Sequence, residues 1–420
     1  MYISRLALDH FRSWEQCLLD LAPGITIFYG NNGLGKTNIV EAVEFLSTGL
    51  SHRTHSAKPL IQAGQSSAHI RANVVTSSDN VQTNETTYSL TLSSRGGHRA
   101  RINNGNSLYL RDIVGEIPSV TFAPEDQQLI SSDPSVRRHF LDSAAVSLVP
   151  GYYELLQRYN HIAKQRVALL KNVAQMRANG QTASADLSQI FTGLEIWTSQ
   201  LVTTGIELTQ ARLSVTEKLR KPFERIYQHI AGTHNRVDLE YVPSYEEILV
   251  QGQSDKNSAY DDIINHYQRI YEGEVAQARN LIGPHRDDVV FHLNEMNARE
   301  YASNGEMWSL ALALKMALYE VISRESRENE VQPLLILDDV FAQLDNSRRS
   351  QIIDFASNLQ QVLITVAAKD DVPEQLLSEN MKDRVHFVDV EALRATERVL
   401  SDVPDLDEFM RQSEKQEETQ

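Results

Sequence analysis

Cysteine is almost absent from this chain. Among 420 residues only Cys17 carries a thiol, which excludes a disulfide framework and any zinc or iron–sulfur site built from several cysteines. Glycine (19 residues) and proline (12) are also few for a loop-rich or all-β chain. No apolar run approaches the ~18 residues that a membrane helix requires, and charge interrupts the first residues too early for a signal peptide. We therefore expect a cytoplasmic protein that makes no membrane contact.

Positive charge is also scarce. The chain has 40 Lys and Arg against 56 Asp and Glu, a net charge of −16, which argues against a protein that coats its surface in nucleic acid. A local basic surface remains compatible with this charge, because salt screens charges more than about 10 Å apart. Two stretches are locally basic. Residues 93–111 contain four arginines and no acid, and residues 151–230 contain ten Lys and Arg against six acids.

The spacing of apolar residues divides the chain into a head and an insertion. Residues 1–122 mostly alternate as strands do, whereas the spacing from about 125 to 278 is helical and strands alternate with helices from 289 onward. No heptad pattern persists, which excludes a long coiled coil. We expect a mixed α/β fold with a helical second lobe. The expected parts are an N-terminal half of the head (1–122), a helical insertion (123–278), a C-terminal half of the head (279–398) and an acidic, disordered tail (399–420).

The most informative motif is a glycine-rich loop. It reads Gly30-Asn31-Asn32-Gly33-Leu34-Gly35-Lys36-Thr37, follows a strand-like run that ends at Tyr29, and is continued by Asn38 in a helical pattern. Glycines let consecutive backbone N–H groups converge on phosphate oxygens, and a helix N-terminus favours an anion. Lys36 would reach the β- and γ-phosphates of ATP, and the Thr37 hydroxyl would bind Mg²⁺. The alternative is a glycine-rich turn before an ordinary helix, but both flanks favour a phosphate-binding loop.

Two adjacent acids follow the apolar run 334–337. Asp338 would lie at the C-terminal end of a buried strand, where it can meet the hydration shell of Mg²⁺. Asp339 follows, where a base could align the attacking water. The alternative is that both acids only cap the strand. Together with the glycine-rich loop, they predict an ATP hydrolysis site with Asp338 and Asp339 as its catalytic residues.

A third element lies upstream of these acids. Ser303 and Gly305 form a Ser-x-Gly turn at the start of an apolar helix, and such a turn can present free N–H groups and a hydroxyl to a second anion. Alone, the pattern is more often a simple helix cap. Its place matches the signature of ATP-binding-cassette proteins, in which the signature of one subunit closes over the ATP of the other.

Several longer runs are more specific, and with the glycine-rich loop they resemble the RecF family of the SMC/ATP-binding-cassette superfamily. The resemblance implies an ABC-type P-loop ATPase head, weak DNA-dependent ATPase activity and an ATP-bound homodimer on gapped DNA or on single-/double-strand junctions. It also implies cooperation with RecR and RecO in loading RecA, and a role in recombinational repair, replication restart and the SOS response. The runs are 6–13, 30–38 with Glu41 and Ala42, 51–54, 122–126, 134–142, 283–288 and 337–345.

The chain departs from the family's pattern at the signature. The family usually has Ser-x-Gly-Gln, whereas Glu306 follows Gly305 here. This predicts a negative charge that would repel a γ-phosphate unless the side chain is turned away or protonated. Asp339 replaces the longer Glu of transporters, which suggests slow hydrolysis. Transporters have a histidine near the γ-phosphate, and Thr365 is a weak candidate for the equivalent position in this chain.

Two other classes remain as alternatives, a transporter nucleotide-binding subunit and a structural SMC-like chromosome protein. The helical insertion argues against the first, and the missing heptads argue against the second. Salt-dependent DNA binding by the isolated chain would discriminate among them. The candidates for DNA contact are Arg95, Arg99, Arg101, Lys218, Arg220 and Lys221. Two pairs inside the family-specific runs have a structural alternative. Residues 285–286 could be hydrogen-bonded residues at the entrance of a strand, and residues 137–138 could be solvent-exposed charges on a helix.

Overall fold

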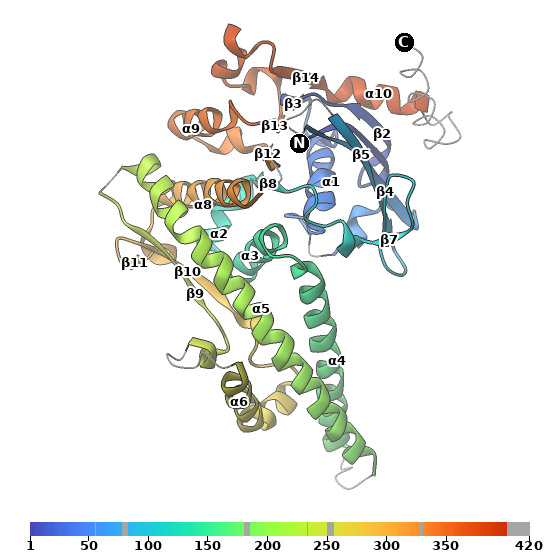
Figure 1. Ribbon diagram of the computed structural model, residues 1–420, viewed down its shortest axis with the longest axis vertical. Coiled ribbons are helices and arrows are strands. Elements are labelled where there is room, and N and C mark those ends of the chain that lie inside the picture. Colours follow the sequence, from blue (N-terminus) through green and yellow to red (C-terminus); the bar gives the residue numbers. More distant parts are fainter. Residues whose placement is uncertain are drawn as a thin grey trace. The chain divides into compact units, whose positions relative to one another are not determined.

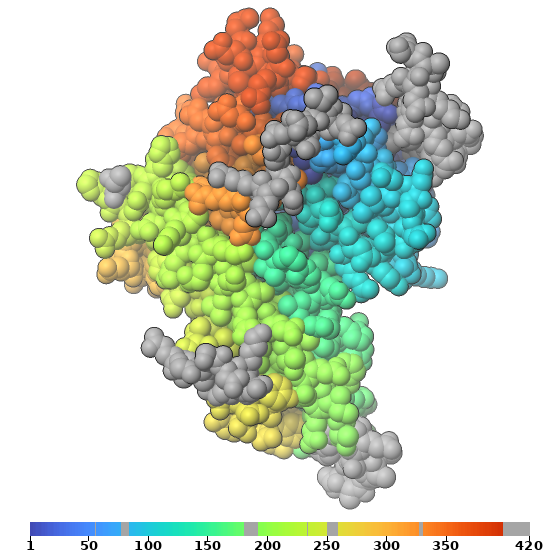
Figure 2. Space-filling view, viewed as in Figure 1, coloured from blue at the N-terminus to red at the C-terminus, as the bar shows by residue number. Residues whose placement is uncertain are grey.

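The structure is a computed structural model in which the chain forms two compact units. The head unit combines Met1–Pro124 with Ile322–Gln420, and the helical unit is Glu125–Val321. Figures 1 and 2 show both units in colours that follow the sequence. The structure describes residues 1–54, 56–77, 83–179, 185–232, 234–249, 256–326 and 331–400.

A parallel five-stranded sheet forms the centre of the head unit and draws strands from both of its chain segments. Its order is β14-β3-β13-β12-β8. Every residue of β12 and β13 is buried, which is typical of parallel strands covered on both faces. The strands are β3 (Gly24–Tyr29), β8 (Ser119–Phe122), β12 (Leu334–Asp338), β13 (Gln361–Val366) and β14 (Val385–Asp389). The helices of this unit are α1 (Lys36–Thr48), α9 (Asn346–Ala356) and α10 (Val390–Leu400).

An antiparallel sheet of order β2-β1-β4-β5-β6-β7 completes the head unit. Its strands are β1 (Tyr2–Phe11), β2 (Trp14–Asp20), β4 (Ser67–Ser77), β5 (Thr83–Ser93), β6 (Arg99–Ile102) and β7 (Leu108–Tyr109). The Asn-Gly pair at 104–105 is typical of a hairpin turn, and a hairpin is present here, because β6 pairs antiparallel with β7 and Gly105 N–H donates to Ile102 O at 3.0 Å in the turn. Arg99 and Arg101 are exposed while Ala100 between them is buried, so the alternation directs both arginines to the open face.

The helical unit is built on helices and a small antiparallel sheet of order β11-β10-β9. Its long helices α4 and α5 follow one another in the chain and pack side by side (Figure 1). Its helices are α2 (Gln128–Ser131), α3 (Pro134–Leu148), α4 (Tyr152–Ala178), α5 (Ala185–Ala231), α6 (Lys256–Gln277), α7 (Ala298–Tyr301) and α8 (Asn304–Glu325), the last of which extends past the boundary. Its strands are β9 (Val237–Val242), β10 (Asp288–Leu293) and β11 (Met296–Asn297). Within the described ranges, no helix is long and apolar enough to cross a membrane.

The division of the chain differs from the expected one at the second boundary. The first break, after Pro124, lies two residues from the expected position, but the second lies after Val321 and not near 279. The reason is strand pairing: β10 pairs with β9 from Asp288↔Val242 to Leu293↔Val237, which ties this segment to the helical unit. At the other end of the chain, α10 continues to Leu400, into the expected tail, and residues 401–420 lie outside the described residues.

Candidate nucleotide-binding site

The glycine-rich loop connects the buried strand β3 to α1, as the sequence predicts. Gly33 (φ 86°) and Gly35 (φ 99°) have left-handed backbone conformations that favour glycine. Space also requires glycine at 35, because a side-chain carbon there would lie 2.8 Å from Ser13 Oγ and 2.9 Å from Trp14 Nε1. The loop therefore has the strand–loop–helix geometry that directs backbone N–H groups toward an anion at the N-terminus of α1.

Lys36 lies across this loop. Its ammonium donates hydrogen bonds to Gly30 O and to Asn31 O, the latter at 3.0 Å. Burial lowers the pKa of Lys36, whereas the nearby carboxylates of Asp339 and Asp338 raise it. The ammonium is thus held between the loop and the two acids that the sequence singled out.

Thr37 and Asp338 meet although 301 residues separate them. The Thr37 hydroxyl donates to Asp338 Oδ1 at 2.9 Å, and the Thr365 hydroxyl donates to the same oxygen at 2.7 Å. The sheet explains this meeting, because β3 and β12 both flank β13 and all three run parallel. A hydroxyl and a carboxylate are hard oxygen ligands of the kind Mg²⁺ prefers. Thr37 and Asp338 therefore fit a magnesium ion.

His52 is a site residue to which sequence reasoning assigned no role. Its Nδ1 lies 2.6 Å from Glu44 Oε2, and its Nε2 lies 3.7 Å from Asp338 Oδ2. Burial alone would lower the pKa of His52, but Glu44 and Asp338 raise it to about 10. Burial likewise raises the pKa of Asp338, but hydrogen bonds from His52, Thr365 and Thr37 lower it below its usual value. At neutral pH a protonated imidazole therefore faces an ionised Asp338.

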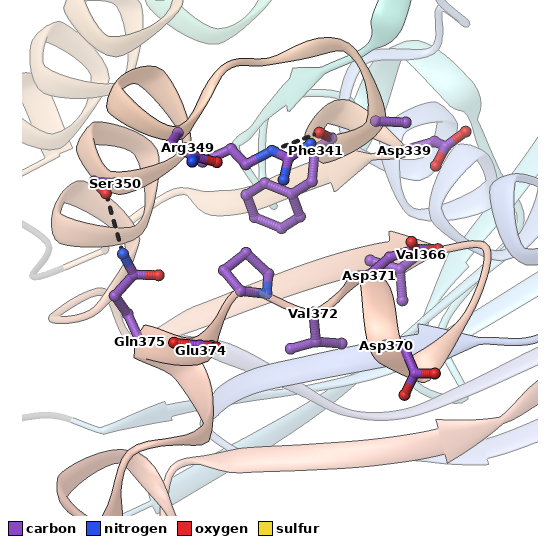
Figure 3. Close-up of a pocket in the computed structure, with 13 residues that line it drawn as sticks. Asp339, Phe341, Arg349, Ser350, Val366, Asp370, Asp371, Val372, Glu374 and Gln375 are labelled. Carbon is purple, nitrogen blue, oxygen red and sulfur yellow. Dashed lines mark hydrogen bonds between the residues drawn. The ribbon is translucent and has the colours of Figure 1, made fainter.

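Asp339 follows Asp338 in an unusual backbone conformation. Its backbone is left-handed (φ 49°), a conformation that costs a residue with a side chain about 1–2 kcal/mol. Its N–H donates to Thr365 Oγ1 at 2.9 Å. The side chain lines a pocket of about 760 Å³ in the head unit. Figure 3 shows Asp339 at one end of this pocket and Arg349 and Ser350 of α9 at the other. The left-handed turn thus gives Asp339 a place at this pocket, whereas Asp338 meets Thr37.

The signature turn is capped by its own glutamate. Ser303 donates to Glu306 Oε2 through its N–H at 2.8 Å and through its hydroxyl at 2.7 Å. These hydrogen bonds lower the pKa of Glu306, so the carboxylate is ionised and turned back onto the start of α8. A capping box thus engages the N–H and the hydroxyl of Ser303, as the helix-cap alternative predicts. Ser303 and Gly305 belong to the helical unit, and the glycine-rich loop belongs to the head unit.

Comparison with known proteins decides among the three classes. Residues 2–386 match the family model described as RecF/RecN/SMC N terminal domain. A protein of Bifidobacterium adolescentis named DNA replication and repair protein RecF is 53% identical over 395 residues, covering 94% of this chain and 92% of that protein. This chain belongs to the RecF family.

Other relatives agree with this membership. A protein of the same name from Bifidobacterium longum subsp. infantis is 53% identical over 393 residues, which covers 94% of this chain and 90% of the relative. A solved structure described as the recombination mediator protein RecF-ATPrS in the RecFOR pathway is similar, with a TM-score of 0.75, 27% identity and coverage of 89% of this chain and 94% of that one. A second structure, described as RecF-ATP, has a TM-score of 0.74 and 26% identity, covering 89% of this chain and 93% of that one.

The RecF-specific runs form a buried ionic network in the helical unit. Arg137 is 3% exposed and donates two hydrogen bonds to Asp288, at 2.6 and 3.0 Å. The alternative of a solvent-exposed charge is therefore wrong for Arg137. Arg212 donates to Asp142 at 2.8 Å and to the fully buried Asp287 at 3.3 Å. These contacts join α3, α5 and the start of β10, which gives the runs a structural role.

The neighbouring residues of these runs are also engaged. Arg138 donates to Asp287 O at 2.7 Å. His285 Nδ1 lies 2.8 Å from Tyr159 Oη, and burial lowers the pKa of His285 to about 4. The ring is therefore neutral at physiological pH, as the hydrogen-bonded alternative predicts.

The candidate DNA contacts differ in how much of their charge is available. Arg99 and Arg111 stack on the ring of Tyr109, with guanidinium carbons 4.2 and 4.8 Å from its centroid. Arg101 is exposed on the same strand, β6. In the helical unit, Arg220 is paired with Asp238 and with Glu217. The hairpin is therefore a better candidate for a RecF-family DNA surface than Arg220.

Proposed function

We propose that this chain is an ATP-binding, slowly ATP-hydrolysing DNA-binding protein of recombinational DNA repair and replication restart. The observation that carries the proposal is the hydrogen bond between Thr37 and Asp338, which joins a phosphate-binding loop to a carboxylate strand. Membership of the RecF family supports it, and so do the similar structures whose descriptions name ATP and ATPrS. Thr37 and Asp338 would hold Mg²⁺, and Lys36 would contact the phosphates.

In this proposal the chain's own residues orient the phosphates, a metal ligand and the attacking water. A bound Mg²⁺ would neutralise phosphate charge. The N–H groups of the glycine-rich loop from Gly30 to Thr37 orient the phosphates, His52 and Thr365 orient Asp338, and Asp339 aligns the attacking water. Asp339 offers a short carboxylate for this last role, which supports slow turnover and a switch-like use of ATP.

Assembly and partners complete the proposal. We infer that ATP drives a homodimer on gapped DNA, in which Ser303 and Gly305 of one subunit approach the ATP of the other. The ionised Glu306 at this turn would weaken that approach. RecR and RecO are the proposed protein partners, with RecA loading and support of the SOS response as the result, in the cytoplasm. Light scattering and gapped-DNA anisotropy with ATP, ADP and no nucleotide test this proposal, and equal behaviour in all three conditions would contradict it.

The two acids are expected to respond differently to loss of charge. Asp338→Asn should weaken Mg²⁺ binding and hydrolysis together, so that more Mg²⁺ is needed for any activity. Asp339→Asn should leave ATP affinity within about twofold while turnover falls about 100-fold, as for loss of a general base. The measurements are ATPase rate against Mg²⁺ concentration, ATP affinity, and dimer content by light scattering. Asp354→Asn, at an exposed position of α9, is the matched control. Equal and mild effects at 338 and 339 would mean that the strand end is only structural.

The β6–β7 hairpin is expected to set the salt dependence of DNA binding. Each phosphate neutralised contributes about −0.9 to the log–log slope. Replacing Arg99 and Arg101 together by Ala should make the slope shallower by about 2 while ATP hydrolysis without DNA stays unchanged. The slope is measured by anisotropy over a salt series. Arg220→Ala, whose charge is already compensated by Asp238, serves as the control. An unchanged slope in the double variant would move the DNA surface to the helical unit.

A further inference from the structure

The helix α10, the last one in the described residues, reaches the outer side of the glycine-rich loop. Arg394 Nε donates to Leu34 O at 2.9 Å, and its Nη1 donates to Ser13 O at 2.9 Å. The guanidinium stacks on the indole of Trp14, 3.5 Å from the ring centroid. Arg394 thus bonds the main chain of the loop, although it belongs to no recognised nucleotide-binding motif of this sequence.

Arg394 is itself firmly placed. Glu397, one turn further along α10, accepts from Arg394 Nη1 at 2.8 Å and from the Glu15 N–H at 2.7 Å. The start of α10 is fixed as well, because Asp389 Oδ1 accepts the N–H of Glu391 at 2.9 Å. Pairing of β14 with β3 places this whole segment beside the strand that leads into the loop. A guanidinium with several fixed partners is a rigid support.

Peptide planarity links this support to the phosphate-binding groups. The carbonyl of Leu34 and the N–H of Gly35 belong to one rigid peptide unit and point in opposite directions. Trp14 Nε1 donates to Gly35 O at 3.1 Å beside the helical bond from the Ile39 N–H at 3.3 Å, and the two bonds fix the next peptide unit and therefore the N–H of Lys36. Arg394 and Trp14 thus hold two consecutive carbonyls on the outer side of the loop, and this orients two consecutive N–H groups toward its inner side.

We propose that Arg394 and Trp14 are positioning residues that pre-orient the N–H groups of Gly35 and Lys36, so that α10 sets the nucleotide affinity of the site. This inference rests on the proposed ATP site. Pre-orientation lowers the entropic cost of ordering the loop around phosphate, so its loss weakens binding without removing any group that contacts the ligand. Neither residue touches the reacting atoms, so turnover at saturating ATP is retained.

The test measures Mg²⁺-ATP affinity of the full chain by calorimetric titration, together with KM and kcat. We expect Arg394→Ala to weaken ATP binding about tenfold and to raise KM similarly, with kcat within about twofold. Arg394→Lys should recover only part of the affinity, because an ammonium cannot bond several carbonyls in one plane. Arg384→Ala is the control, since Arg384 also donates to a main-chain carbonyl, that of Leu359 at 2.7 Å, away from the loop.

The outcomes separate this inference from the proposed function. If the wild-type chain binds ATP and Arg394→Ala binds it as tightly as Arg384→Ala, the inference is overturned. If the wild-type chain binds no ATP, the proposed function itself is contradicted. Should Arg394→Ala lower the melting temperature without nucleotide, Trp14→Phe decides, because it keeps a stacking ring and removes only the N–H donor to Gly35 O. Reduced affinity in Trp14→Phe would support the inference, and unchanged affinity would overturn it.

Discussion

Replacing Lys36 with Met is expected to weaken ATP binding strongly and to abolish any ATP-dependent association with DNA. The ammonium of Lys36 lies across the loop, bonded to Gly30 O and Asn31 O, where it would offset the charge of the β- and γ-phosphates. Met has a similar length and no charge, so the change removes the interaction with little change of shape. A loss of affinity of about a hundredfold or more is expected, since bonds to charged phosphates are strong. Titration with Mg²⁺-ATP measures it.

Two further variants make this result specific. Lys36→Arg keeps the charge but misplaces it, so some binding should persist while hydrolysis falls. Lys58→Met removes a lysine at an exposed position of the same unit and should change neither property. If Lys36→Met hydrolyses ATP like the wild type, the nucleotide site has been assigned to the wrong loop.

Replacing Asp287 with Ala is expected to destabilise the helical unit by about 3–5 kcal/mol, the usual cost of removing one partner from a buried ion pair. Asp287 is fully buried and accepts hydrogen bonds from Arg212 at 3.3 Å, from the Ser244 N–H at 2.7 Å and from the Tyr241 hydroxyl. The substitution leaves Arg212 buried with less compensating charge. Urea unfolding followed by far-UV circular dichroism gives the free energy of unfolding.

The exposed pair Arg220–Asp238 provides the comparison for Asp287. Asp238→Ala breaks an ion pair whose side chains are 42% and 45% exposed, so a loss of at most about 1 kcal/mol is expected. Trp197 and Trp308 lie in the helical unit and Trp14 in the head unit, so fluorescence helps to assign which unit unfolds. A midpoint for Asp287→Ala no lower than that for Asp238→Ala would show that the buried network is not important for stability.

Features encoded by contiguous residues could be predicted from the sequence. The glycine-rich loop, the acid pair after β12 and the β6–β7 hairpin each depend on neighbours within a few positions. The boundary near 279 was missed because it depends on pairing between β9 and β10, and pairing partners cannot be chosen from apolar spacing alone. His52 and Arg394 reach the site through tertiary contacts that follow no fixed spacing. The contact of the Glu306 side chain with Ser303 could have been predicted, since these two residues match the Ser-x-x-Glu pattern of a capping box.

The interleaved parallel sheet has a consequence for how the chain acquires its structure during synthesis. In the head unit β13 lies between β3 and β12, and β12 lies between β13 and β8. The strands β3 and β8 leave the ribosome long before β12 and β13, with the whole of Glu125–Val321 synthesised in between. Until then their edges lack their native partners. The helical unit can form first, and completion of the head must wait for the final part of the chain, which makes this a slow step of high contact order.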